Sequence, residues 1–383
     1  MGTLEIIKPG LLTTVQDSGR YAHQKSGVSV SGVMDPLAHI IANILCGNDD
    51  LNEAVLELTM TGPSILFHDD AFISITGADF APEIDGVAVE TWKSYKIKKG
   101  STLSFQGRKS GMRAYIGIFG GMDIPLVMGS KSTYLKAKIG GYEGRQLKIG
   151  DKIHYFQTDV VNKKSVQLPS SVNFLVDEST QSGKIELPSS DKETILRVVL
   201  GPQDDAFTSE GIETFLSSPY TVSNEADRMG YRLEGKAIQH KGKSDIISDG
   251  MLMGGIQVPG QGKPIILMAD RQTTGGYTKI ACVIYADLYK VAQAKTGDVF
   301  RFQAISVEEA QDIYRVWSSE FGIHNSEIRT PNSELNLDVS INEKQYSIAI
   351  QTVIDPKIPQ GQKNYDVSVN GEHFFVSVRS LNN

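Results

Sequence analysis

A glycine turn that leads directly into a short alternating strand recurs along this chain. It occurs at Lys99–Phe105, Ile149–Tyr155 and Thr296–Phe302, and in each copy apolar and polar side chains alternate after the glycine. Glycine accepts the backbone angles of a tight turn, and alternation is typical of a strand with one buried face. Short strands joined by such turns favour closed or strongly curled β-sheets. The sequence therefore predicts a mainly β fold with a few helices, of the α+β class.

Local capping chemistry predicts the helices. Asp35 is placed to cap a helix that begins at Pro36 and ends at Gly47. Ser306 and Glu309 form a capping box before an amphipathic stretch, so a second long helix is expected there. Two further helices are expected, one including Ile212, Phe215 and Leu216 and one following Ala286.

Changes in composition divide the 383 residues into three expected domains. The chain becomes polar between residues 160 and 194, and a linker-like stretch follows Gly322. We therefore expect domains at residues 1–190, 191–322 and 323–383. The last of these contains two alternating repeats, 337–348 and 365–376, each with a central two-residue turn, so it should form a small β-hairpin appendage.

Charge and cysteine usage exclude several classes of protein. The net charge of −7 argues against general binding to nucleic acid or to an anionic membrane. Cys46 and Cys282 both lie in apolar runs, which favours free thiols in a reducing compartment over a disulfide framework. No basic leader or bilayer-spanning stretch is evident. A cytoplasmic location is expected.

Three segments contain more Gly, Arg, Asp, Asn and Thr than a core requires. The first segment comprises residues 13–20, 32–36, 43 and 47–48, the second comprises 120–121, 129–133 and 140–145, and the third comprises 227–233, 254–259 and 269–277. Glycine-rich strings in curled sheets commonly serve the backbone alone, and arginines commonly pair with nearby acids. Arginines set among Gly and Thr, however, also suit a site for carboxylate or phosphoryl groups.

These segments resemble the signatures of the biotin-dependent carboxyltransferase family, in the family's order. The strings that carry the resemblance are Thr14–Asp17 with Gly19–Arg20, Arg228–Leu233 and Asp270–Tyr277. The family includes the C subunit of 5-oxoprolinase, allophanate hydrolase subunit 2, the carboxyltransferase portion of urea amidolyase, and a protein that antagonises a kinase inhibitor. The resemblance spans roughly the first five-sixths of the chain and implies paired cyclophilin-like β-barrel domains.

The resemblance also implies a function. It implies a subunit of an ATP-dependent 5-oxoprolinase, which opens 5-oxoproline to glutamate together with the A and B subunits of that enzyme, the B subunit being the direct partner. ATP use follows from the resemblance, and a partner could hold the nucleotide. The alternatives are a carboxyltransferase component of a urea or allophanate system, and a regulatory protein that antagonises a kinase inhibitor homologous to the B subunit.

Candidate site residues come from the three segments. Arg271, Asp270 and Arg228 are the candidates for chemistry. The candidates for binding substrate or an anion are Arg20, Asp35, Asn43, Ser130, Thr133, Arg145, Gln257, Gln272, Thr273, Thr274 and Tyr277. Arg271 is the most strongly favoured, because its polar string follows an apolar strand, 264–268, that would deliver it to a cleft.

Missing motifs narrow the mechanism. Gly129–Thr133 lacks the glycine spacing of a Walker phosphate loop, and no Gly-x-Ser-x-Gly nucleophile elbow occurs. The seven histidines are scattered without metal-ligand spacing, so no metal site is expected. The biotinylation motif Ala-Met-Lys-Met is absent from the sequence, so we expect no covalently attached biotin on this chain.

Overall fold

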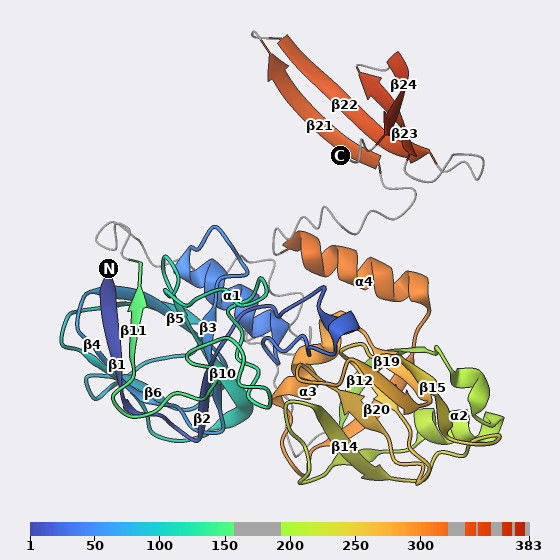
Figure 1. Cartoon of the computed structure of the whole chain (residues 1–383), viewed down its shortest axis with the longest axis horizontal. Helices are drawn as coiled ribbons and strands as arrows, with labels where there is room; N and C mark the ends of the chain where they lie inside the picture. Colours follow the sequence, from blue (N-terminus) through green and yellow to red (C-terminus); the bar gives the residue numbers. More distant parts are fainter. Residues whose placement is uncertain (157–192, 321–333, 342–343, 354–361, 370–371, 380–383) are drawn as a thin grey trace. The chain divides into compact units, whose positions relative to one another are not determined.

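The computed structural model describes residues 1–156, 193–320 and four strands between 334 and 379. The chain divides into two compact units, Met1–Phe321 and Gly322–Asn383 (Figure 1). The domain boundaries expected at 190/191 and 322/323 lie outside the described residues. None of the helices in the described part of the chain is long and apolar enough to cross a bilayer.

The first half of the larger unit consists of two sheets that share one core. The six-stranded sheet has the order β11 (Lys152–Tyr155), β1 (Gly2–Lys8), β4 (Ser64–Phe67), β9 (Thr102–Phe105), β6 (Pro82–Ile84) and β7 (Val87–Ala88). The five-stranded sheet has the order β2 (Leu12–Gln16), β3 (Val55–Thr59), β10 (Ser110–Ile118), β5 (Ala71–Asp79) and β8 (Lys93–Ile97). Buried side chains from both sheets, including Leu4, Phe67, Ile73 and Ile116, form a single apolar cluster.

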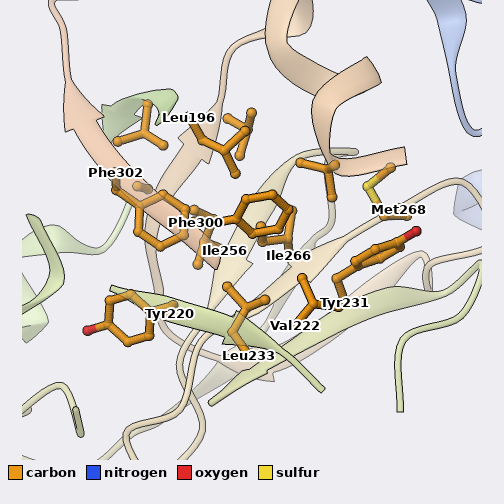
Figure 2. Packing of buried hydrophobic residues seen from close by; sticks show 14 of the residues in the cluster. Leu196, Tyr220, Val222, Tyr231, Leu233, Ile256, Ile266, Met268, Phe300 and Phe302 are labelled. Atoms are coloured by element: carbon orange, nitrogen blue, oxygen red, sulfur yellow. The ribbon is translucent and has the colours of Figure 1, made fainter. Parts of the chain in front are cut away.

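The second half forms a closed seven-stranded barrel. Its order is β12 (Thr194–Leu200), β19 (Lys279–Val283), β16 (Gly255–Gln257), β17 (Ile265–Leu267), β14 (Gly230–Gly235), β13 (Tyr220–Val222) and β20 (Val299–Ala304). Leu196, Ile256, Ile266 and Phe300 fill the interior, as Figure 2 shows. A separate two-stranded ribbon pairs β15 (Asp245–Gly250) with β18 (Thr274–Tyr277).

The helix expected after Asp35 begins and ends where its capping residues predict. In α1 (Pro36–Cys46) the Asp35 side chain accepts a hydrogen bond from the amide of Ala38, and Gly47 ends the helix in the left-handed conformation. The helix lies on β5 and β10, where Ser74 and Thr76 donate to its backbone carbonyls. Elsewhere the structure has α2 (Ser209–Ser217), α3 (Leu288–Gln293), α4 (Val307–Glu320) and the short 3-10 turns η1 (Gln24–Ser26), η4 (Asp204–Ala206) and η5 (Tyr285–Asp287).

The tail forms one four-stranded antiparallel sheet in sequence order. Its strands are β21 (Glu334–Ile341), β22 (Lys344–Val353), β23 (Gln362–Val369) and β24 (Glu372–Arg379). The two predicted hairpins are therefore confirmed as β21–β22 and β23–β24, and the pairing of β22 with β23 joins them.

The structure confirms the fold prediction in its coarser form. The chain is mainly β with few helices, and its described strands form one closed barrel. Paired barrels were expected, but the strands of the first half form two sheets whose outer strands, β11 and β7 in one and β2 and β8 in the other, end their hydrogen-bonded ladders. Closure needs a strand that pairs with both ends of the ladder, which β20 provides in the second half by pairing with β12 and β13.

Candidate functional site

The Asp17 carboxylate joins the first and second polar segments. It accepts hydrogen bonds from the amide of Gly19 (2.9 Å), the amide of Lys131 (2.6 Å) and the hydroxyls of Ser130 (2.7 Å) and Ser132. A buried carboxylate that accepts several bonds from two loops holds those loops in a fixed relation. Gly129–Thr133 resembles a phosphate loop in its residue types. In the structure, however, the Lys131 amide and the Ser130 and Ser132 hydroxyls of this loop donate to the Asp17 carboxylate.

Arg20 lies fully buried at the same junction. Its Nε donates to the carbonyl of Val127 and its Nη2 to that of Ser132, both at 2.8 Å, while its Nη1 has no partner among the described residues. Burial lowers the pKa of Arg20, and the nearby Asp17 opposes this effect. Gly140 adopts a φ of +66°, and a Cβ there would lie 2.4 Å from Arg20 Nη2, so only glycine leaves room for the guanidinium.

Arg228 joins the first and third segments across the two halves of the larger unit. Its Nε and Nη2 each lie 3.0 Å from a carboxylate oxygen of Asp270, and its Nη1 pairs with Glu57. Nη2 also donates to the carbonyl of Gly32 at 2.6 Å. Burial alone would lower the pKa of Arg228, but the carboxylates of Asp270 and Glu57 outweigh burial and raise it. This guanidinium is fully engaged by internal partners.

Asp35 caps α1 at the same interface. One of its oxygens accepts from the amide of Ala38 (2.9 Å) and the other from the side-chain amide of Gln293 (2.7 Å) on α3 of the second half. Burial raises the pKa of Asp35 to about 6, and hydrogen bonds from Ala38 and Gln293 work against this shift. Asp35 thus combines helix capping with contact between the halves.

Four other candidate residues form hydrogen bonds or ion pairs that hold loops. Asn43 donates to the carbonyls of Leu51 (3.1 Å) and Glu53 (2.9 Å). The remaining contacts are the pairing of Arg145 with Asp151 and Glu143, a bond from the Thr133 hydroxyl to the carbonyl of Val15, and a bond from the amide of Met251 to the carbonyl of Thr273. These contacts tie down loops, and none of them leaves a charged group unpaired.

Arg271 differs from Arg228 in having no carboxylate partner. It is 7% exposed, its Nε donates to the carbonyl of Met251 (3.1 Å) and its Nη1 to that of Met268 (3.3 Å). No carboxylate among the described residues lies within ion-pair distance of it, although an arginine has five N–H donors. Burial lowers the pKa of Arg271, and Tyr21, from the first half, is the first of the groups that oppose this shift. A buried cation without a counter-ion favours an anionic ligand.

The third segment also lines a pocket of about 750 Å³ on the barrel. Its walls come from β14, β16, β17 and β18 and the loops beside them, and they include Met229, Gly230, Arg232, Leu233, Gln257, Pro264, Ile265, Leu267, Gln272, Gly275 and Tyr277. The Gln272 amide donates to the Gln257 side-chain oxygen at 3.1 Å. Thr274 is exposed on β18 and its Cα pairs with that of Gly250 on β15. The pocket therefore gathers Gln257, Gln272 and Tyr277 from the candidate residues.

Sequence reasoning missed two charged residues at the interface. Glu57 accepts from the Tyr115 hydroxyl (2.9 Å) as well as from Arg228, and Arg113 donates to the Tyr231 hydroxyl and the carbonyl of Ala292, both at 2.6 Å. Both residues interrupt apolar strands, Val55–Thr59 and Ser110–Ile118. A charge in an otherwise apolar strand was the signal that could have identified them.

Among the described residues, no group of three or more His, Cys, Asp or Glu side chains is placed to hold a metal ion. Neither cysteine forms a disulfide, and burial raises the pKa of the Cys282 thiol to about 11, which disfavours a reactive thiolate.

Comparison with known proteins places the chain among carboxyltransferase domains. Residues 26–304 match the family described as "Carboxyltransferase domain, subdomain A and B". The chain is 39% identical to the C subunit of 5-oxoprolinase from Escherichia coli K12 over 307 residues, covering 80% of this chain and 93% of that protein. It is 31% identical to the urea amidolyase of Lachancea kluyveri over 369 residues, covering 92% of this chain and 20% of that protein. The crystal structure of the K. lactis urea amidolyase matches with a TM-score of 0.76 and 25% identity, over 93% of this chain and 23% of that one.

Proposed function

Because the chain belongs to the carboxyltransferase domain family, subdomains A and B, we propose that it is a subunit of an ATP-dependent 5-oxoprolinase. The observation that carries this proposal is the share of each relative's length that the match covers. The match to the C subunit of 5-oxoprolinase extends over 93% of that protein, whereas the match to the amidolyase of L. kluyveri occupies 20% of a much longer chain. In this proposal the chain acts with the A and B subunits of the enzyme to convert 5-oxoproline to glutamate.

Arg271 is the residue of this chain that we propose to assist the chemistry. Activating the amide carbonyl by phosphorylation places negative charge on oxygens near the ring, and 5-oxoproline also carries a carboxylate. A buried guanidinium with no carboxylate partner among the described residues is suited to either charge. Arg228, by contrast, is held by Asp270 and Glu57, so we assign Arg228 to joining the two halves through Glu57 and Asp270 to fixing the guanidinium of Arg228.

We place the ATP on a partner protein. The loop at Gly129–Thr133 does not fit a phosphate, because its donors are taken. The amide of Lys131 and the hydroxyls of Ser130 and Ser132 donate to Asp17, and the Lys131 ammonium pairs with Glu53. An anionic phosphate placed there would have to displace a buried carboxylate from several hydrogen bonds.

Reconstitution tests the proposal directly. The chain should be combined with the A and B subunits of 5-oxoprolinase, and ATP hydrolysis should be measured with and without 5-oxoproline. We expect hydrolysis that depends on 5-oxoproline in the three-protein mixture and almost none when any of the three is left out. Strong 5-oxoproline hydrolysis by this chain alone, or no hydrolysis by a mixture in which the three proteins co-purify, would contradict the proposal.

A carboxyltransferase component of a urea-type system is the second candidate. The observation in its favour is that the matches to the amidolyases of L. kluyveri and K. lactis extend over 92% and 93% of this chain, against 80% for the C subunit of 5-oxoprolinase, and so reach the tail unit. In that case biotin would be attached to a separate carrier chain, since Ala-Met-Lys-Met does not occur in this sequence.

Removing the tail separates the two candidates. A variant without residues 325–383 should keep full 5-oxoproline-dependent ATP hydrolysis in the reconstituted mixture if the chain functions in a 5-oxoprolinase. Carboxylation of urea by the full chain with a biotinylated carrier and a biotin carboxylase, lost on removal of the tail, would favour the second candidate instead.

A further inference from the structure

Arg271 has one guanidinium nitrogen that is neither bonded to protein nor sealed from solvent. Its Nε and Nη1 donate to the carbonyls of Met251 and Met268, but its Nη2 has no hydrogen-bond partner among the described residues. Arg20 also has an unpartnered nitrogen, Nη1, but that atom is fully buried, whereas Nη2 of Arg271 keeps contact with solvent. The two N–H groups of this nitrogen can therefore reach a ligand.

Tyr21, from the first half, is held close to Arg271 by the loop that follows β2. The amide of Arg20 donates to the carbonyl of Val30 (2.7 Å), and the hydroxyl of Ser29 donates to the carbonyl of Arg271 (3.0 Å). Partial loss of surrounding water raises the pKa of Tyr21, and the nearby Arg271 guanidinium opposes this shift. Tyr21 is 59% exposed, and its hydroxyl has no hydrogen-bond partner among the described residues.

Tyr285 approaches from the barrel, where it begins η5 shortly after β19. Residues 251–254 link it to Arg271, because the carbonyl of Met251 accepts from Arg271 Nε (3.1 Å) and the carbonyl of Gly254 accepts from the amide of Val283 (2.9 Å). Val283 precedes Tyr285 by two residues. Tyr285 is 41% exposed, and no described residue forms a hydrogen bond with its hydroxyl.

The ring of Tyr285 is held between two rings of α4. Its centroid lies 5.5 Å from that of Tyr314 and 5.0 Å from that of Trp317, with the ring planes close to perpendicular in both pairs. Such edge-to-face contacts restrict the ring. Loss of surrounding water raises the pKa of Tyr285, and Tyr21 is near enough to raise it further. The hydroxyls of Tyr21 and Tyr285 are therefore close to each other, and Tyr21 is close to Arg271.

The carboxylates around this cluster are already engaged. Asp270 has both of its oxygens bonded to Arg228. Asp17, which acts on the pKa of Tyr21, accepts hydrogen bonds from amides and hydroxyls, and Asp35 accepts from two amide donors. None of the three forms an ion pair with the cation of the cluster.

A single positive charge determines which anion fits. Among the described residues, Arg271 is the one cation that acts on the pKa of Tyr21, and none acts on that of Tyr285. A carboxylate carries one negative charge, whereas a phosphoryl group carries about 1.5 to 2 at neutral pH. The cluster therefore matches a carboxylate better than a phosphoryl group.

We propose that Arg271, Tyr21 and Tyr285 bind the carboxylate of the substrate. Nη2 of Arg271 and the Tyr21 hydroxyl donate to one carboxylate oxygen, and the Tyr285 hydroxyl donates to the other. The two halves must be packed together for this site to exist, because Tyr21 belongs to the first half and the other two residues to the second. The identity of the natural ligand as 5-oxoproline rests on the proposed function.

Binding of a simple carboxylate to the full chain is the first test. The probe is cyclopentanecarboxylate, which has a five-membered ring and a carboxylate but no amide, and 2-pyrrolidinone, which has the ring amide without a carboxylate, is the ligand control. We expect the probe to bind the natural chain, measured by saturation-transfer NMR and calorimetry, and 2-pyrrolidinone to bind at least about tenfold more weakly. Inorganic phosphate that displaces the probe at equal concentration would overturn the assignment to a carboxylate.

Variants then assign the binding to the two tyrosines. Tyr21→Phe and Tyr285→Phe each remove one donor and keep the ring, so each should weaken binding of cyclopentanecarboxylate by about tenfold. Tyr95→Phe is the matched control and should bind normally, because the Tyr95 hydroxyl donates to the carbonyl of Glu90 (2.7 Å) within the first half. Natural affinity in both Tyr21→Phe and Tyr285→Phe, or no binding of the probe to the folded natural chain, overturns the assignment.

The outcomes separate this inference from the proposed function. In the reconstituted complex, the loss of a binding group should raise the KM for 5-oxoproline more than it lowers kcat. If the complex hydrolyses ATP with 5-oxoproline while Tyr21→Phe and Tyr285→Phe keep the natural KM, the carboxylate site is overturned and the function stands. If cyclopentanecarboxylate binds in a way that depends on both tyrosines but the complex shows no 5-oxoproline-dependent hydrolysis, the site stands and the function falls.

Discussion

Three buried arginines near the interface show how partners decide the role of a side chain. Arg228 is neutralised by two carboxylates, whereas Arg113 and Arg271 bond only to carbonyls and a hydroxyl among the described residues. Arg113, on β10 of the first half, is held by groups of the second half, and the centroid of the Tyr231 ring lies 5.8 Å from its guanidinium carbon. Of the two without a carboxylate partner, only Arg271 is directly followed by a pocket-lining residue, Gln272. Identical residue types therefore divide into structural and functional candidates by their contacts.

Arg271 should be needed more for activity than for folding. Arg271→Lys keeps the charge but loses the planar, two-pronged donor set, so we expect it to cost about 1 to 3 kcal/mol of transition-state stabilisation, or about 5- to 150-fold in kcat/KM. Arg271→Ala should cost more. Activity and thermal unfolding should be measured on the same reconstituted variants.

A matched control is Arg301→Lys on β20, where the arginine is paired with Glu193 at the surface. It should change neither quantity appreciably, because exposed ion pairs contribute little. Full activity in an Arg271→Lys complex with a lowered melting temperature would show that Arg271 is structural.

Asp35 should make stability depend on pH. Burial raises its pKa to about 6 in the folded chain, above the value of about 3.9 expected when unfolded. Because the folded state binds this proton more tightly, the contribution of Asp35 to the free energy of unfolding is largest at low pH and declines as pH rises through 6. We expect the advantage of the natural chain over Asp35→Ala to shrink by about 1 kcal/mol between about pH 5 and about pH 7.5. Urea unfolding at both pH values measures this, and an unchanged difference would contradict the raised pKa.

Some contacts of individual residues could be predicted from the sequence, and others could not. Asp35 was identified as a helix cap because its capping partner lies three residues away, within the reach of local pattern reasoning. Its contact with Gln293 depends on how the two halves pack, and nothing in the local sequence encodes that. The same holds for Glu57, whose partner Arg228 is 171 residues distant.

At the scale of elements, the loops of the first two polar segments behave as one unit. The Asp17 carboxylate holds the loop that follows β2 against the Gly129–Thr133 loop, and Thr133 donates through its amide (3.0 Å) and its hydroxyl (2.9 Å) to the carbonyl of Val15. These turns have little regular structure of their own, so side chains supply the bonds that a ladder supplies elsewhere.

Asp17→Asn should therefore destabilise the larger unit. The variant places an N–H₂ group among donors that need an acceptor, so we expect a loss of about 2 to 4 kcal/mol in the free energy of unfolding. Urea unfolding of the purified chain measures it. Asp50→Asn, at an exposed turn whose side chain accepts from the amide of Asn52, should lose less than about 0.5 kcal/mol. Equal losses in the two variants would show that Asp17 has no special role.

Elements were predictable where the signal was local, and sheet closure was not. Capping residues predicted α1 and the start of α4, and alternation around two-residue turns predicted the tail hairpins. Whether strands close into a barrel depends on which distant edges pair, and β12 joins β20 about 100 residues later. Alternation identifies a buried face but not the neighbouring strand. One closed barrel and two stacked sheets are thus equally compatible with the same local pattern.

At the scale of the whole molecule, polar contacts fix the two halves of the larger unit to each other. The side chain of Gln293 accepts from the amides of Met112 (3.0 Å) and Arg113 (3.1 Å) and donates to Asp35. Ser29 donates to the carbonyl of Arg271 at 3.0 Å. These bonds, with the Arg228 ion pairs, place Arg271 and its loop against the first half. The candidate site thus depends on the packing of the halves.

Removing Arg228 should uncouple the halves. Arg228→Met leaves the carboxylates of Glu57 and Asp270 buried without their cation, and breaking such a pair costs about 3 to 5 kcal/mol. Since the lost bonds to Glu57 and to the carbonyl of Gly32 span the interface, we expect calorimetry to resolve two transitions within Met1–Phe321 of the variant and a single transition for this unit in the natural chain. The triple variant Arg228→Met, Glu57→Gln and Asp270→Asn should recover most of the loss, because it removes the uncompensated charges.

Arg145→Met is the control, because it breaks two ion pairs that lie entirely within the first half. If Arg228→Met and Arg145→Met both unfold in one transition with similar losses, the ion pairs of Arg228 do not hold the halves together, and the position of Arg271 must depend on apolar packing instead.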